Sequence, residues 1–287
     1  MDHTQNQLSF SCHSENFGKQ PAEDTFALIH RLGFAHIDVA SRSLIPQAAI
    51  LKDWRSRAAE MRALSLKHSL QLSELFLSNL EVEGRPVSPA QAEAVDSKAL
   101  FQNFETICRF AKEAGFQSIM GAAGSAIETL GWERSFENAA AVLSRQVSIA
   151  GEYGLSFHVE PSRTSLLHTP SKALSMIRMV PGLRYTLDFL HFHVQGVPLS
   201  ESLKLIPFAG HMHARQAAFP TGKCDFASGG IDYDRIVRAM AGYGWSGAIA
   251  MEFWNGDREN AEGIDPVEQN IVMRYALKKL AEKYGLI

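Results

Sequence analysis

The chain has 287 residues, of which 46% are hydrophobic and 21% charged, so it is long enough to bury a large core. Its formal net charge of -3, with no long Lys/Arg block, gives no electrostatic basis for nucleic-acid binding and favours a small-molecule partner. The first residues lack the basic start and long apolar stretch of a signal peptide, and no apolar run is long enough to span a membrane. We therefore expect a cytoplasmic protein without a membrane partner. Its three cysteines form no C-x-x-C pair, which argues against disulfides and a structural zinc site.

Short apolar runs alternate with longer stretches of helical period along the whole chain, as a parallel α/β fold requires. The predicted strands are Leu8–Cys12, Ala35–Ala40, Gln71–Leu77, Ser118–Ala122, Leu155–Glu160, Arg184–Phe189, Phe208–His213 and Gly247–Phe253. The predicted helices are Pro21–Leu32, Leu100–Ala114, Ser135–Tyr153, Ser171–Val180, Tyr233–Tyr243 and Pro266–Tyr284. Eight strands in a chain near the roughly 250 residues typical of such folds predict a (β/α)8 TIM barrel, with residues 1–287 as one domain. The Gly/Pro-containing segment Leu80–Val95 is expected to be an extended loop on the rim.

Four acidic or histidine residues stand at the ends of successive predicted strands in the second half of the chain. They are Glu160 in LSFHVEPS, Asp188 in RYTLDFLH, His213 in FAGHMHARQ and Glu252 in GAIAMEFW. In a parallel barrel these strand ends meet at the face that carries the chemistry. Three carboxylates so close together would repel one another, whereas a divalent cation that prefers oxygen ligands satisfies them together. The pattern predicts one site for Mn2+ or Mg2+, with Co2+ or Zn2+ as substitutes.

Three residues of this set also have a structural interpretation. Glu160 could pair with Arg163 or Lys172, Asp188 could cap a helix, and Glu252 could form a salt bridge to an arginine. An unpaired carboxylate in the apolar strand of Glu252 would be costly to bury, so a cation is a natural partner there.

Two further histidines accompany the set. His211 lies two residues before His213, on the same side of the strand, and we expect it to be a core or second-layer histidine. His191 follows Asp188 by three residues, and we expect it to face the substrate from just beyond the strand end.

These motifs, between Glu160 and Glu252, resemble those of the xylose isomerase-like TIM-barrel superfamily, which includes sugar isomerases, ketose 3-epimerases, inosose dehydratases and endonuclease IV. The resemblance implies that Glu160 and Glu252 bind metal and also form the acid/base pair. It implies that Asp188 and His213 hold the ion and that His191 binds a substrate oxygen. The predicted fourth strand, in SIMGAAGS, lacks the histidine that a trinuclear endonuclease site would need.

The segment after His213 departs from the sugar epimerase pattern, because the acidic residue usual three positions later is Gln216. Arg215, with Lys223 in the following loop, suits a carboxylate better than a neutral hydroxyl, which favours a sugar acid. Arg215 could equally clamp a carboxylate of the barrel. Trp254 is expected to form an apolar wall against the substrate.

The function expected from these residues is a metal-dependent sugar or sugar-acid isomerase or epimerase that works through an enediolate. A lyase, either a dehydratase or a decarboxylase acting on a keto sugar acid, would use the same site. A non-catalytic ligand-binding barrel is the third alternative. A sugar or sugar acid is the expected partner, and homo-oligomer formation is left open.

Overall fold

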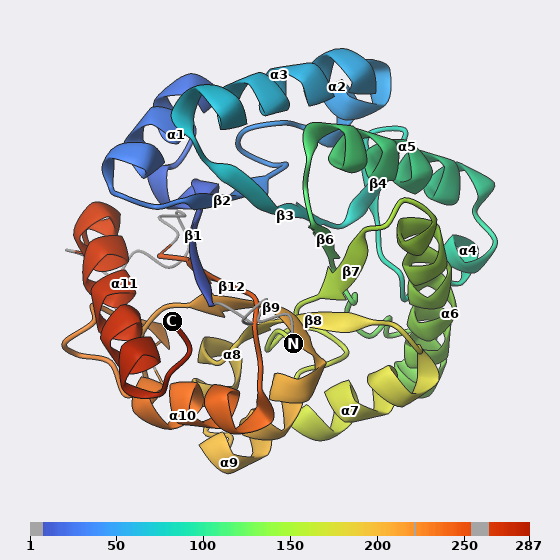
Figure 1. The fold of residues 1–287 in the computed structure, drawn as a ribbon. Helices are drawn as coiled ribbons and strands as arrows, with labels where there is room; N and C mark the ends of the chain where they lie inside the picture. The colour runs from blue at the N-terminus through green and yellow to red at the C-terminus, as the bar shows by residue number, and fades with distance from the viewer. Residues whose placement is uncertain (1–7, 221, 254–263) are drawn as a thin grey trace, which may run out of the picture.

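The computed structural model describes residues 8–220, 222–253 and 264–287. Eight parallel strands close into a barrel in the order β1-β12-β9-β8-β7-β6-β3-β2 (Figure 1). They are β1 (Ser9–His13), β2 (His36–Ala40), β3 (Gln71–Ser78), β6 (Ser118–Gly121), β7 (Ser156–Val159), β8 (Arg184–Asp188), β9 (Ala209–Ala214) and β12 (Ala248–Met251). All eight predicted strands are present with shifted ends, and the predicted (β/α)8 barrel is confirmed.

The helices form a ring around the barrel (Figure 1). They are α1 (Ala22–Arg31), α2 (Gln47–Lys52), α3 (Trp54–His68), α4 (Ala92–Val95), α5 (Lys98–Ala114), α6 (Gly131–Glu152), α7 (Pro170–Met179), α8 (Leu190–His193), α9 (Leu199–Ser202), α10 (Tyr233–Tyr243) and α11 (Pro266–Lys283). Two 3-10 turns, η1 (Ser14–Phe17) and η2 (Leu203–Phe208), complete the connections. The main apolar core lies between the strands and this ring, where one face of each strand meets the buried stripe of a helix.

Local sequence signals determine where several of these helices begin and end. The Ser97 hydroxyl accepts a hydrogen bond from the Leu100 amide at the start of α5, and Thr169 caps α7 through the Lys172 amide. Gly115 ends α5 at φ 104°, a left-handed conformation that a side chain would strain. The chain can therefore turn directly from α5 into β6.

Helix α3 was not among the predicted helices. Of its 15 residues only Ala58, Met61 and Leu64 are buried, so its apolar stripe is narrow and its sequence is largely polar. Its start is still marked, because the Asp53 carboxylate accepts a hydrogen bond from the Ser56 amide. Packing against α5 and α1, rather than a strong sequence period, stabilises it.

The segment Leu80–Val95, expected to be an extended loop, contains regular structure. Strands β4 (Leu80–Val82) and β5 (Arg85–Val87) pair as an antiparallel hairpin, and the short α4 follows. A second small hairpin, β10 (Ala217–Ala218) with β11 (Gly222–Lys223), follows β9. In the part of the chain that the structure describes, no helix has the length and apolar character needed to cross a membrane.

Candidate metal centre

The four predicted ligands lie at the C-terminal ends of neighbouring strands. Glu160 directly follows β7, Asp188 ends β8, His213 lies in β9 one residue before its end, and Glu252 directly follows β12. These four strands are adjacent in the barrel, so their side chains share one part of its C-terminal face.

His213 stands between the two glutamates. Its Nδ1 lies 3.3 Å from Glu160 Oε1 and 3.1 Å from Glu252 Oε2. Ligand atoms of these three residues lie within 4.8 Å of one another, close enough to surround one cation. Glu160, Asp188 and His191 form a second group within the same limit. Because Glu160 belongs to both groups, the two form one continuous cluster.

Asp188 makes the helix-start contact that its structural interpretation predicted, and its second oxygen faces the cluster. Its Oδ1 accepts a hydrogen bond from the Leu190 amide, 2.8 Å away, at the start of α8. Its Oδ2 faces the cluster, where His191 Nε2 is 3.9 Å away. The capping bond therefore orients the carboxylate and leaves one oxygen directed at the site.

Arg215 is buried against the same carboxylates. Its Nε and Nη2 lie 2.8 and 2.7 Å from Asp188 Oδ2, and Nη2 is 3.2 Å from Glu252 Oε2. Tyr233, from α10, fixes the Arg215 backbone by donating to its carbonyl and accepting from its amide. Arg215 therefore clamps barrel carboxylates, the structural role that the sequence left open. A contact between Arg215 and a substrate anion stays a prediction, and the ion pairs of Arg215 with Asp188 and Glu252 do not favour it.

The charges in the cluster shift the pKa values of its side chains. Burial raises the pKa of Glu160 and Glu252, but neighbouring positive charges outweigh it, chiefly His191 for Glu160 and Arg215 for Glu252. Both pKa values therefore lie below the ordinary 4.5. Burial lowers the pKa of His213, yet the glutamates and Asp38 hold it well above 6.5. The carboxylates are thus kept ionised and paired with positive charge.

The donor set fits a divalent cation. Three carboxylates and one imidazole offer the oxygen-rich environment that Mn2+ and Mg2+ prefer, and the imidazole admits Co2+ or Zn2+ as well. Glu252 Oε2 is buried and, among the described residues, makes no hydrogen bond, although it lies within ion-pair distance of His213 and Arg215. The assignment of all four residues as ligands stays a prediction.

The other predicted substrate contacts are His191, Lys223 and Trp254, of which His191 lies beside this cluster. His191 Nε2 is 3.3 Å from Glu160 Oε2, and neither ring nitrogen has a hydrogen-bond partner among the described residues. Lys223 is buried on β11, opposite Ala217. Trp254 lies outside the described residues. The roles of all three in substrate binding stay predictions.

A pocket of about 360 Å³ opens beside Glu160. Phe76 and Met120 form an apolar part of its lining, and hydroxyl and amide side chains form the polar part. The polar side chains, besides Glu160, are Ser78, Asn79, Ser88, Ser125, Ser162, Thr164 and Ser165. Such groups can donate to and accept from several hydroxyls of one small ligand.

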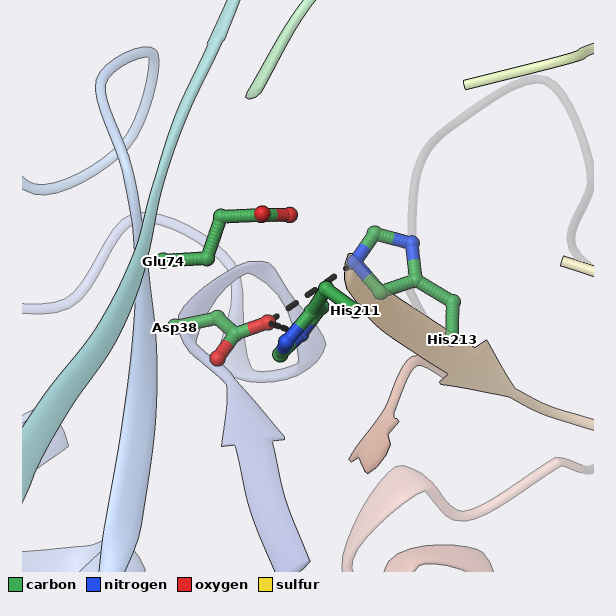
Figure 2. A group of neighbouring side chains, drawn as sticks. All are labelled: Asp38, Glu74, His211 and His213. Carbon is green, nitrogen blue, oxygen red and sulfur yellow. Dashed lines mark hydrogen bonds and ion pairs between the residues drawn. The ribbon is translucent and has the colours of Figure 1, made fainter. Parts of the chain in front are cut away.

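A layer of buried polar side chains lies next to the site inside the barrel, and its main member, Asp38 on β2, was not among the predicted site residues. Figure 2 shows Asp38 reaching His211 and His213, with Glu74 nearby. His211, expected to be a core or second-layer histidine, donates a 2.6 Å hydrogen bond from Nε2 to Asp38 Oδ2. An aspartate within the apolar run of β2 is the same kind of signal that pointed to Glu252.

The sequence matches the family described as xylose isomerase-like TIM barrel over residues 26–272, and the chain belongs to this family. No curated protein matches it.

Solved structures share the fold over nearly the whole chain. A D-allulose 3-epimerase from Methylomonas sp. is 15% identical with a TM-score of 0.76, covering 96% of this chain and 98% of its own. The probable 3-DHS dehydratase AsbF from Bacillus anthracis is 15% identical with a TM-score of 0.72, covering 94% and 98%. The 3-keto-D-glucoside 4-epimerase YcjR from E. coli is 13% identical with a TM-score of 0.71, covering 96% and 100%. Identities this low show the fold alone.

Proposed function

We propose that this protein is a divalent-metal-dependent sugar isomerase or epimerase. The observation that carries the proposal is the position of Glu160 and Glu252, which flank His213 Nδ1 at 3.3 and 3.1 Å beside a hydroxyl-lined pocket. Glu160 belongs both to this cluster and to the lining of the pocket. A substrate carbon in the pocket would therefore lie within reach of a carboxylate.

In the proposed site Glu160, Asp188, His213 and Glu252 hold the ion. When bound, the ion supplies Lewis-acid polarisation of a carbonyl and its neighbouring hydroxyl, which makes the adjacent C–H more acidic. Asp188 and His213 are then the two ligands without a proton-transfer role.

Glu160 and Glu252 are proposed to move the proton. Because their pKa values are depressed, both are ionised near neutral pH and can accept a proton from carbon. If one carboxylate removes the proton and the other returns one to the opposite face, the substrate is epimerised. If the proton returns to the former carbonyl carbon and the hydroxyl proton passes to the former carbonyl oxygen, the substrate is isomerised.

The lining of the pocket favours a neutral sugar as the substrate. The sequence, because of Arg215, had favoured a sugar acid. Among the described residues that line it, none is Lys or Arg, and Arg215 is already paired with Asp188 and Glu252. A D-allulose 3-epimerase of the same fold has been solved in complex with D-allulose. We therefore propose a neutral polyhydroxy ketone as the substrate class.

Solvent exchange tests this proposal. The wild-type protein with Mn2+ is incubated in D2O with ketoses, inososes and keto sugar acids, and deuterium incorporation is followed by NMR. We expect exchange at the carbon next to the carbonyl of a neutral ketose, abolished by a chelator. Glu160→Gln and Glu252→Gln should each lower the rate by about 100-fold or more.

Glu128→Gln is the matched control, because Glu128 is an exposed carboxylate in the connection between β6 and α6, close in sequence to the pocket lining. Its exchange rate should equal that of the wild type. Release of water or CO2 would show a lyase instead, and no exchange with any compound of the panel would contradict catalysis of this kind.

A further inference from the structure

The barrel interior next to the candidate metal centre is polar. Asp38 on β2, Glu74 on β3, His158 on β7 and His211 on β9 are all buried there. They fall into two hydrogen-bonded groups, Asp38 with His211 and Glu74 with His158, and several of the distances are 2.6–2.7 Å. Buried carboxylates and imidazoles are costly unless they are paired, so these two groups constrain the strands that bear the site.

Both carboxylate oxygens of Glu74 have hydrogen-bond partners. Its Oε1 is bonded to the Ser118 hydroxyl at 2.9 Å and to His158 Nδ1 at 2.6 Å, and its Oε2 accepts from the Thr186 hydroxyl at 2.7 Å. Although Asp38, Glu74, His211 and His213 lie close enough together to hold a cation, the oxygens of Glu74 are engaged. We therefore interpret Glu74 as part of the barrel scaffold.

Asp38 differs from Glu74 because it reaches the candidate metal centre. Its Oδ1 accepts a 2.6 Å hydrogen bond from the Ser11 hydroxyl, and its Oδ2 is 2.6 Å from His211 Nε2. The same Oδ2 lies 3.7 Å from His213 Nε2 (Figure 2). Ser11 and His211 thus hold the Asp38 carboxylate in place beside the His213 ring.

The two nitrogens of His213 face different groups. Nδ1 faces Glu160 and Glu252, whereas Nε2 is buried and has no hydrogen-bond partner among the described residues. A neutral imidazole that binds a cation through one nitrogen carries its proton on the other. For His213 that proton would be on Nε2, and Asp38 Oδ2 is the carboxylate beside it.

We propose that Asp38 is a positioning residue, which holds His213 with its proton on Nε2 and so leaves Nδ1 free to bind the ion. The inference rests on the proposed metal site and extends it to a residue without a ligand role. A ligating histidine typically donates its other N–H to a carboxylate or carbonyl, which fixes the ring and its tautomer. Aromatic contacts from His13 and His211 on the His213 ring restrict its orientation further.

Mn2+ affinity, measured by the EPR signal of free Mn2+, tests the inference. Loss of such a partner typically weakens metal binding by about 10–100-fold, and we expect a loss of this size for Asp38→Ala. Asp38→Asn keeps an acceptor oxygen without the charge, so its affinity should lie between those of Asp38→Ala and the wild type. Circular dichroism checks that each variant is folded.

Glu74→Gln is the control, since Glu74 is as buried as Asp38 and belongs to the same polar layer. It should retain wild-type Mn2+ affinity even where it lowers stability. Unchanged affinity in folded Asp38→Ala, or an equal loss in Glu74→Gln, would overturn the inference. A wild-type protein that bound no Mn2+ would instead contradict the proposed function and, with it, this inference.

A second measurement needs no variant. In the wild-type protein loaded with diamagnetic Mg2+, 15N NMR of the histidine rings reports which nitrogen of His213 carries the proton. We expect the proton on Nε2. A proton on Nδ1 would overturn the inference even if the Asp38 variants failed to fold.

Discussion

The guanidinium of Arg215 lies against Asp188, with Nε and Nη2 at 2.8 and 2.7 Å from the same carboxylate oxygen. Nη2 also reaches Glu252 at 3.2 Å, so one buried cation joins the ends of β8 and β12. An arginine committed in this way organises the carboxylates of the site.

Arg215→Met should therefore act on the whole site. Removing one partner of a buried ion pair typically costs about 3–5 kcal/mol, and we expect a loss of this size in the free energy of unfolding of the metal-free protein, measured with urea. Turnover of acidic and neutral substrates should fall by the same factor. Lys204→Met, which breaks an exposed pair with Glu201, is the control and should change stability by about 1 kcal/mol or less. A loss confined to acidic substrates would show that Arg215 binds a substrate anion.

Asp188→Asn should weaken metal binding while the barrel stays folded. The amide oxygen of Asn can still accept from the Leu190 amide, so the start of α8 is kept, but the charged ligand is lost. We expect Mn2+ affinity, measured by calorimetry, to fall by about 10-fold or more, which is ~1.4 kcal/mol. Wild-type affinity in the folded variant would remove Asp188 from the ligand set.

His191→Ala should harm turnover more than metal content. The His191 ring lies 3.3 Å from Glu160 and 3.9 Å from Asp188, at the edge of the cluster, where it can meet a substrate oxygen. Loss of one hydrogen bond to a substrate predicts a fall in kcat/KM of about 10-fold or more. Metal analysis should still find one Mn2+ per chain. A folded variant that bound no Mn2+ would make His191 a ligand.

The metal-free protein should lose stability as the pH rises above 6.5. Despite burial, nearby carboxylates raise the pKa values of His211 and His213 above 6.5. The contribution of the two protonated histidines to the free energy of unfolding is therefore complete below pH 6.5, and it is lost as the pH rises through the raised pKa values. The pKa values of Glu160 and Glu252 are lowered, so the effect of pH has the opposite sign for these residues. Their contribution to the free energy of unfolding is lost as the pH falls below 4.5. Urea unfolding at pH 6.5 and at about pH 9 measures the difference, and equal stability at both would contradict the assigned charges.

Bound Mn2+ should offset the loss of stability that we expect at high pH. Metal binding requires His213 without its extra proton, so the stabilisation by Mn2+ should increase over the same pH range. The shift in Tm on addition of Mn2+, measured by thermal unfolding at each pH, reports this stabilisation. A metal effect that was constant or decreased with rising pH would count against His213 as a ligand.

The barrel and the four strand-end residues were predictable because each depends on a local pattern. A short apolar run predicts a buried strand, and in a parallel barrel its last polar residue is directed to the C-terminal face. Helix α3 was missed because only Ala58, Met61 and Leu64 are buried, too few to mark a period. Asp38 was missed because its partners are distant in the chain: Ser11 lies on β1 and His211 on β9. Pairings between distant strands form only when the barrel closes.

Anomalous diffraction from crystals soaked in Mn2+ tests the central claim most directly. We predict one peak among the side chains of Glu160, Asp188, His213 and Glu252, with Nδ1 as the nitrogen of His213 that contacts it. No peak between these four side chains, in crystals soaked at a pH where His213 can lose its extra proton, would contradict the proposed metal centre.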